Sequence, residues 1–288
     1  MKLFIVTTTY NRSEEMKRLF VSLQMQTCTD FEWLIIDDGS TDGTSDLVNQ
    51  FIEKSKFPIT YIFKENGGKH TAYNRAITHM GTGGFHVIVD SDDWLAESAV
   101  ATFLRDISLL LATDYIGVVY PKTSLKNKYT WLPRDVKTVN IPEIKFLYGL
   151  NIETCIVISN SATDNFQFPS FNNEKFLSEE TFYYYLVAKG SFLPRSAEVY
   201  YFEYLEDGLT NNIFMLWKKN TKGTLYSLEQ RKNYIKNDLR GRRQLIELAK
   251  VKLNINALLF LNKDFKKYTL LDYLMLPITL IFCRIRFK

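Results

Sequence analysis

The sequence predicts an α/β protein, in which helices flank both faces of a mostly parallel, Rossmann-like central sheet. Apolar runs rich in β-branched residues alternate with amphipathic runs over about the first 120 residues. Polar motifs follow three of these apolar runs, and ligands of such sheets bind at the carboxyl ends of parallel strands. A change from acidic to basic composition near residue 212 predicts a helical, basic C-terminal extension.

The elements can be assigned in order from the spacing of their apolar residues. A strand at residues 2–7 precedes a helix at 13–26, in which Met16, Leu19 and Leu23 recur at helical spacing. The later elements are strands at 32–37, 59–64, 85–90 and 115–120, and helices at 44–54, 70–80 and near 96–111. We therefore expect one domain over residues 1–211, regular as far as residue 120 and less regular afterwards, and an extension over 212–288.

Charge is divided unequally between these parts. Residues 1–211 contain 19 lysines and arginines against 27 aspartates and glutamates, a net charge of −8. Residues 212–288 contain 17 against 5, a net charge of +12. A basic extension favours an anionic partner, either nucleic acid or a membrane surface. Long apolar runs interrupt the basic residues, which favours a membrane surface, so we expect no nucleic-acid partner.

The most apolar segment is "YTLLDYLMLPITLIFCRIRFK", at the C-terminal end. It offers about 16 residues before its arginines and contains Asp272 and Pro277, whereas a membrane-spanning helix needs about 20 apolar residues. We expect an interfacial or re-entrant helix here; packing as ordinary core is the alternative. Three widely separated cysteines and the lack of a signal peptide favour a reducing, cytoplasmic location.

Three aspartates crowd together in "HVIVDSDDW", directly after an apolar run. Asp90, Asp92 and Asp93 repel one another, and no basic residue adjoins them in the sequence. Oxygen ligands of this kind suit Mg²⁺ or Mn²⁺, which take one or two protein carboxylates and complete their shell with substrate phosphates. We expect such an ion at Asp90 and Asp92. The alternative is a solvated cluster that caps the following helix.

The other polar motifs suit a nucleotide, although the glycine-rich motifs of dinucleotide- and ATP-binding sheets are lacking. "VTTTYNR" supplies hydroxyls, an aromatic ring and Arg12. In "IIDDGSTDGT", Asp38 fits either an ordinary turn or a contact with the base or ribose. Two glycines precede Lys69 and His70 at a predicted helix start, which favours an anion there. We interpret His70 as structural.

Together these motifs resemble a known family. "TTYNR", "WLIIDDGSTDGT", "NGGKHTAYNRAI" and "VIVDSDDW" have the order and spacing found in inverting, family 2-like glycosyltransferases with the GT-A fold, of the bacterial polysaccharide type. The resemblance covers roughly the first 100 residues. A weaker resemblance continues through "FPSFNNEKFLSEE" (168–180) and "YLEDGLTNN" (204–212).

The resemblance implies a role for each motif. Residues 1–120 would bind the nucleotide-sugar and residues 121–211 the acceptor. The donor would be bound by Thr8, Tyr10, Arg12, Asp38, Lys69, Asp90 and Ser91. Asp90 and Asp92 would form the D-x-D motif, with Asp92 as the direct ligand of Mn²⁺ or Mg²⁺. Glu179 matches the acidic residue that acts as general base, and the adjacent Glu180 is the alternative.

The resemblance implies an inverting, metal-dependent transfer of a sugar from a nucleotide-diphosphate donor, a UDP-sugar, to a hydroxyl group. The acceptor would be a glycan or lipid-linked glycan of a bacterial surface polysaccharide, at the inner face of the plasma membrane. One alternative is a nucleotidyltransferase that makes the activated sugar, but "TTTYNRSEEM" lacks the glycine-rich loop expected after its first strand. The other is a non-catalytic nucleotide-sugar-binding subunit, although this chain retains every carboxylate of the motifs.

Overall fold

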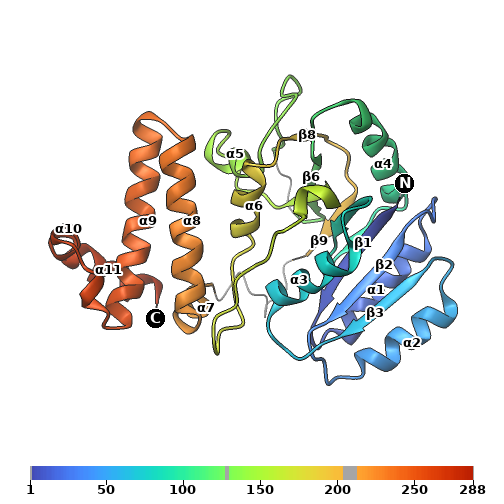
Figure 1. Cartoon of the computed structure of the whole chain (residues 1–288), viewed down its shortest axis with the longest axis horizontal. Coiled ribbons are helices and arrows are strands. Elements are labelled where there is room, and N and C mark those ends of the chain that lie inside the picture. Colours follow the sequence, from blue (N-terminus) through green and yellow to red (C-terminus); the bar gives the residue numbers. More distant parts are fainter. Residues whose placement is uncertain (1, 127–129, 204–212, 288) are drawn as a thin grey trace. The chain divides into compact units, whose positions relative to one another are not determined.

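The computed structural model describes residues 2–126, 130–203 and 213–287 (Figure 1). The chain divides into two compact units. The first contains Met1–Gln167 and Tyr185–Tyr204, and the second contains Phe168–Tyr184 and Leu205–Lys288. The domain boundary predicted after residue 211 and the motif at 204–212 lie outside the described residues.

The first unit is built on a sheet whose N-terminal strands are all parallel. These strands are β1 (Leu3–Thr9), β2 (Glu32–Asp37), β3 (Ile59–Phe63) and β4 (Phe85–Ile88), in the spatial order β3-β2-β1-β4. The helices between them are α1 (Ser13–Gln24), α2 (Thr44–Lys54) and α3 (Lys69–Met80). Each element lies within about two residues of its predicted range. All seven residues of β1 are buried, as a strand covered on both faces requires.

The second half of the sheet mixes strand directions. β7 (Thr154–Ser159) lies between β4 and β6 (Gly117–Ser124) and is antiparallel to both, so β6 runs in the same direction as β4 without adjoining it. Three short strands complete the sheet: β5 (Trp94–Leu95), β8 (Phe192–Pro194) and β9 (Tyr200–Phe202). β8 and β9 pair in parallel with β6, and β5 pairs antiparallel with β9. The α/β fold with a mostly parallel sheet is confirmed.

Helices cover both faces of this sheet. Alternate residues of a strand point to opposite faces, and Leu3 and Ile5 join a buried cluster with Met16 of α1, Phe51 of α2 and Phe103 of α4. α3 packs on β1 and β2 and buries Ala72, Tyr73 and Ala76. α4 (Ala99–Ser108) continues into the 3-10 helix η1 (Leu109–Ala112), and α5 (Ile141–Phe146) and the 3-10 helix η2 (Asn160–Thr163) follow.

From residue 213 onward, the described residues of the second unit form helices only. They are α7 (Ile213–Lys219), α8 (Thr221–Asp238), α9 (Gly241–Leu261), the 3-10 helix η4 (Phe265–Lys267), α10 (Leu270–Leu274) and α11 (Leu276–Arg286). α8 and α9 lie side by side, and α11 packs on α9 (Figure 1). The predicted helical extension is confirmed. Among the described residues, no helix is long and apolar enough to cross a bilayer.

Candidate active site

The polar motifs meet at the carboxyl edge of β2, β1 and β4, as the sequence predicts. The loops after β1 and β2 bind each other directly. The Asn11 amide N–H donates to Ser40 Oγ at 2.9 Å, and Asn11 Oδ1 accepts from the Thr41 amide at 2.8 Å. The Ser13 amide donates to Asp42 Oδ2 at 2.9 Å. These bonds hold the two loops as one polar rim.

Asp38 is buried just after β2 and anchors the loop that starts α3. Its Oδ1 accepts from Lys64 Nζ at 2.6 Å and from the Gly67 amide at 2.9 Å. Its Oδ2 accepts from the Gly68 amide at 2.7 Å. The anion expected at this helix start is therefore, in this structure, the Asp38 carboxylate itself. Its contact with a base or ribose stays a prediction.

The glycine of "DDGS" is required by the backbone. Gly39 has a φ of +88°, and a Cβ placed on it would lie 2.8 Å from the Asn66 amide nitrogen. A side chain at position 39 would therefore strain the turn and separate the loops after β2 and β3. The turn interpretation of this motif thus has a structural basis, whether or not Asp38 also contacts a nucleotide.

Asp90 to Asp93 form a tight turn between two strands. The Asp93 amide donates to the Asp90 carbonyl oxygen at 3.1 Å, and β5 begins at the next residue, Trp94. α4 begins only at Ala99, with Ser98 at its N-cap. The alternative in which the aspartates cap the following helix is therefore wrong.

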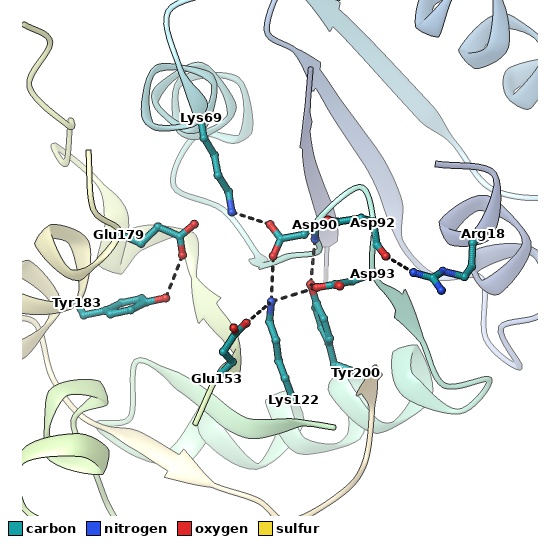
Figure 2. A network of polar contacts seen from close by, with 10 residues as sticks. All are labelled: Arg18, Lys69, Asp90, Asp92, Asp93, Lys122, Glu153, Glu179, Tyr183 and Tyr200. Carbon is teal, nitrogen blue, oxygen red and sulfur yellow. Dashed lines mark hydrogen bonds and ion pairs between the residues drawn. The ribbon is translucent and has the colours of Figure 1, made fainter. Parts of the chain in front are cut away.

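Two lysines supply the positive charge that the aspartates need (Figure 2). Lys69 Nζ lies 2.6 Å from Asp90 Oδ1, and Lys122 Nζ lies 3.0 Å from Asp90 Oδ2. Lys122 Nζ also lies 3.3 Å from Asp93 Oδ2 and 3.7 Å from Glu153 Oε2. No basic residue adjoins the aspartates in the sequence, but the fold brings Lys69 and Lys122 beside Asp90. Part of the positive charge that the aspartates need therefore comes from the protein itself.

Tyr200 joins this network from below the turn (Figure 2). Its hydroxyl donates to Asp93 Oδ2 at 2.6 Å and accepts from the Asp90 amide at 3.0 Å. The Lys122 ammonium lies 4.2 Å from the centre of its ring. Burial alone would raise the pKa of Asp90, but Lys122 and Lys69 outweigh it and lower that pKa. Burial would likewise lower the pKa of Lys122, but the charge of Asp90 and its neighbours raises it well above the ordinary value.

Asp92 is the carboxylate of this turn that forms no ion pair with a described residue, whereas Asp90 pairs with two lysines and Asp93 with Lys122. Burial and the charge of Asp90 raise its pKa, and Arg12 and Lys69 oppose this rise only in part. Arg18 donates to the backbone carbonyl of Asp92 instead of its carboxylate. A divalent cation would supply the missing charge, so the residues fit such an ion. No three His, Cys, Asp or Glu side chains in the described residues form a ready-made metal site, so substrate oxygens would have to complete the shell.

The remaining donor-site candidates lie on the same edge. Thr8 is buried near the end of β1, and Ser91 is buried inside the aspartate turn. The Tyr10 ring is 49% exposed and available for stacking. Arg12 forms an ion pair with Glu15 at 2.8 Å. His70 is buried in α3, where burial lowers its pKa, consistent with the structural role predicted for it.

The two candidates for the general base differ in their surroundings. Glu180 Oε2 accepts from Arg231 Nε at 2.8 Å, contacts Arg231 Nη2 as well, and accepts from the Tyr184 hydroxyl at 3.0 Å. Glu179 is exposed, and its Oε2 accepts from the Tyr183 hydroxyl at 3.2 Å (Figure 2). Glu180 therefore serves as the counter-ion of the half-buried Arg231, and Glu179 stays the predicted base.

A comparison with protein families identifies the catalytic unit. The model of glycosyl transferase family 2 matches residues 4–167, a range that includes the polar rim, the aspartate turn and Lys122. The chain belongs to glycosyl transferase family 2. Membership agrees with the resemblance drawn from the motifs alone.

Segments of this family 2 chain are similar to named glycosyltransferases. A segment of 119 residues is 30% identical to the glycosyltransferase GlyA of Streptococcus pneumoniae, covering 41% of this chain and 17% of GlyA. Another segment, of 156 residues, is 27% identical to the poly(ribitol-phosphate) β-N-acetylglucosaminyltransferase TarS of Staphylococcus aureus, covering 54% of this chain and 26% of TarS. The matches thus span about a quarter or less of the length of these two relatives.

Solved structures show the fold of the family 2 chain. TarS 1–349 in complex with UDP has a TM-score of 0.60 at 19% identity, over 95% of this chain and 77% of that one. The mannosyltransferase PcManGT of Pyrobaculum calidifontis, in complex with GDP-Man and Mn²⁺, has a TM-score of 0.56 at 15% identity, over 98% and 80%. The predicted GT-A fold is confirmed.

Two residues of the site in this family 2 chain were not predicted from the sequence, Lys122 and Tyr200, and neither was the contact of Asp93 with both of them. Lys122 is 32 residues from Asp90 in sequence, and Tyr200 is 110 residues away. One signal was available: Lys122 directly extends the apolar run "YIGVVYP", where a buried lysine requires acidic partners.

Proposed function

We propose that the chain transfers a sugar from a nucleotide-diphosphate donor to a hydroxyl group of a glycan or lipid-linked glycan, with inversion at the anomeric carbon. One observation carries this proposal: Asp92, which has no ion pair with a described residue, lies within the family 2 match and on the same sheet edge as the motifs after β1 and β2 that suit a nucleotide. A UDP-sugar is the favoured donor, because TarS has been solved with UDP and with UDP-GlcNAc. PcManGT, solved with GDP-Man, makes a GDP-sugar the competing choice.

The chain's own residues would bind the donor at both ends. The exposed Tyr10 ring would stack on the base, and Thr8 and Asp38 would lie beside the base or ribose. Arg12 and Lys69 would contact the phosphates, because guanidinium and ammonium groups are the usual phosphate ligands. Ser91 and Asp90 would line the sugar side of the turn.

A bound Mn²⁺ or Mg²⁺, held by Asp92 with Asp90, would neutralise the diphosphate as it leaves. Mg²⁺ commonly takes one or two protein carboxylates and fills its shell with phosphate oxygens and water, which agrees with the small number of carboxylates here. Lys122 and Lys69 fix the direction in which Asp90 points, so the turn is already ordered before a donor arrives.

Glu179 would act as the general base. Its carboxylate takes the proton of the acceptor hydroxyl, whose oxygen attacks the anomeric carbon on the face opposite the diphosphate. The bond from that carbon to the diphosphate oxygen breaks, and the two products are an inverted glycoside and a nucleoside diphosphate. The Tyr183 hydroxyl donates to Glu179 Oε2 at 3.2 Å and would help to orient this carboxylate.

The acceptor proposal follows from the kind of relatives that the chain has. TarS is named for transfer to poly(ribitol phosphate). We therefore place this chain in surface-polysaccharide assembly, on the cytoplasmic side and at the inner face of the plasma membrane. The membrane location is part of this proposal.

A donor screen tests the proposed function. The melting temperature of the chain is measured with UDP-glucose, UDP-galactose, UDP-GlcNAc and GDP-mannose, each with and without Mn²⁺, and donor hydrolysis is followed in parallel. We expect one UDP-sugar to raise the melting temperature in Mn²⁺ and to be hydrolysed slowly. A donor that binds without hydrolysis would indicate a non-catalytic subunit, and pyrophosphate release from UTP and a sugar phosphate would indicate a nucleotidyltransferase. No response to any donor would refute the proposal.

A further inference from the structure

Helices α10 and α11 expose aliphatic side chains in a continuous pattern. Ile278, Ile281 and Ile285 of α11 recur at spacings of three and four residues, which places them on one side of that helix, and Leu274 of α10 precedes them. Leu270 and Leu271 precede them. These six residues, which we call the aliphatic face, are between 56% and 79% exposed. The alternative in which this segment packs as ordinary core is therefore wrong for these six side chains.

The opposite side of the same helices buries smaller and more polar groups. Asp272, Thr279 and Cys283 are all buried, and the helices pack through this side onto α9. Asp272 Oδ1 lies 2.6 Å from Lys252 Nζ, and Cys283 Sγ lies 3.9 Å from the Ala257 carbonyl oxygen. An amphipathic helix at a protein surface in water has the reverse arrangement. The sequence suggested that Asp272 interrupts the apolar segment, but its carboxylate turns inward and leaves the aliphatic face unbroken.

An exposed apolar surface of this kind indicates a partner. Basic residues at both ends of the aliphatic face define the chemistry of that partner. Lys263, Lys266 and Lys267 precede it, Arg284 and Arg286 lie at its far end, and all five are exposed. The only acidic residue at the preceding end is Asp264, which pairs with Lys267 at 2.9 Å. Aliphatic side chains bordered by cations match the acyl boundary and headgroups of an anionic bilayer.

We propose that α10 and α11 form a membrane-contacting surface, with the aliphatic face in the interface of an anionic bilayer and the flanking basic side chains at its headgroups. This surface does not depend on the proposed sugar transfer. If that function holds, the surface would keep the enzyme on the membrane that carries a lipid-linked acceptor.

Co-sedimentation of the full chain with vesicles tests the proposal. Vesicles of phosphatidylcholine and phosphatidylglycerol at three to one are compared with vesicles of phosphatidylcholine alone, at low and at high salt. We expect binding to the anionic vesicles at low salt and much weaker binding in the other conditions. The double variant Ile278→Gln/Ile281→Gln should lower the partition coefficient about tenfold or more, since it removes two aliphatic groups from the interface.

Two further variants separate the electrostatic contribution to vesicle binding from the apolar one. Lys266→Gln/Arg284→Gln should weaken binding about fivefold for each charge removed at low salt, with no effect at high salt. Leu109→Gln/Leu111→Gln is the matched control, because these leucines of η1 are also more than half exposed but lie outside the surface. The control should bind as the wild type does.

Each other outcome overturns the proposal. The wild type could fail to bind anionic vesicles, or the isoleucine variant could bind as well as the control. A third outcome is a dimer in sedimentation velocity that Ile278→Gln/Ile281→Gln dissociates, without vesicle binding, and this would assign the face to a second copy of the chain. The thermal shift with UDP and Mn²⁺ is measured on every variant, so that loss of membrane binding is distinguished from failure of the proposed function.

Discussion

Replacing Lys122 with methionine should destabilise the fold strongly. Methionine keeps the length of the side chain and removes its charge. Lys122 is buried and compensates Asp90 at 3.0 Å and Asp93 at 3.3 Å, so the variant leaves two carboxylates 3 residues apart without their shared cation. Removing one partner of a buried ion pair costs about 3–5 kcal/mol. Lys69 still compensates Asp90, and Asp93 can take up a proton. We therefore expect a loss at the lower end of this range, about 3 kcal/mol.

Lys69→Met is the matched control. Lys69 binds the same Asp90 at 2.6 Å, but its side chain is 41% exposed. Pairs at that exposure contribute about 0–1 kcal/mol, so this variant should unfold nearly as the wild type does. Urea unfolding of the three proteins at pH 7.5, followed by circular dichroism, gives the free energies. A Lys122→Met variant within 1 kcal/mol of wild type, or equal losses in both variants, would refute the assignment of Lys122 as the internal counter-ion.

Four further predictions follow from the site and its surroundings. Glu179→Gln should keep the donor-induced thermal shift and lose about 10²- to 10⁴-fold in transfer. Glu180→Gln should instead lower the melting temperature, because it weakens the contact with the half-buried Arg231; the opposite pattern would move the base to Glu180. Asp92→Asn should abolish Mn²⁺-dependent UDP binding in calorimetry with the fold intact, and an affinity equal to wild type would contradict the metal role. Asp38→Asn should lower the melting temperature as well as raise the donor KM, because its carboxylate binds three donors; an unchanged melting temperature would contradict this. Burial lowers the pKa of His86 from 6.5 to about 4. As the pH drops, the unfolded chain therefore takes up this proton before the folded chain does, and the free energy of unfolding falls between about pH 6.5 and about pH 4. Urea unfolding should show about 2 kcal/mol lost between pH 7 and pH 5 through this group, and His86→Asn should lose less over the same interval; equal losses would exclude His86 as the cause.

The N-terminal half of the fold could be predicted because its signals are local. Buried parallel strands such as β1 and β2 are continuous apolar runs, and the helices between them have clear apolar spacing. Parallel strands end at the same edge, so the sequence alone could bring the motifs at 8–12, 38 and 90–92 together. β5, β8 and β9 have only two or three residues each, too few for a periodic pattern, and were missed.

The acidic turn shows what local sequence patterns cannot predict, namely the contacts between residues far apart in the sequence. Its crowded aspartates predict that positive charge lies among them, and part of that charge comes from Lys69 of α3 and Lys122 of β6. The metal ion at Asp90 and Asp92 stays a prediction. Lys122 reaches Asp90 only because β7 lies between β4 and β6 and places β6 beside the turn. In α10 and α11, composition likewise predicted an interfacial segment. Only packing against α9 shows that Asp272 faces inward and the isoleucines face outward.

The two lysines on Asp90 differ in a way that suits donor binding. Lys122 is buried beside Asp93 and Tyr200, so its release from Asp90 would remove one of the carboxylates that compensate its buried charge. Lys69 stands at the exposed start of α3, where its contact with Asp90 contributes little stability and can be exchanged at small cost. If the proposed function holds, an arriving diphosphate would therefore compete with Asp90 for Lys69 and not for Lys122. Exchange of Lys69 would leave Asp90 Oδ1 without its lysine. A divalent cation would then bind more favourably at the turn, and the phosphate oxygens of the donor would complete the coordination shell of that cation.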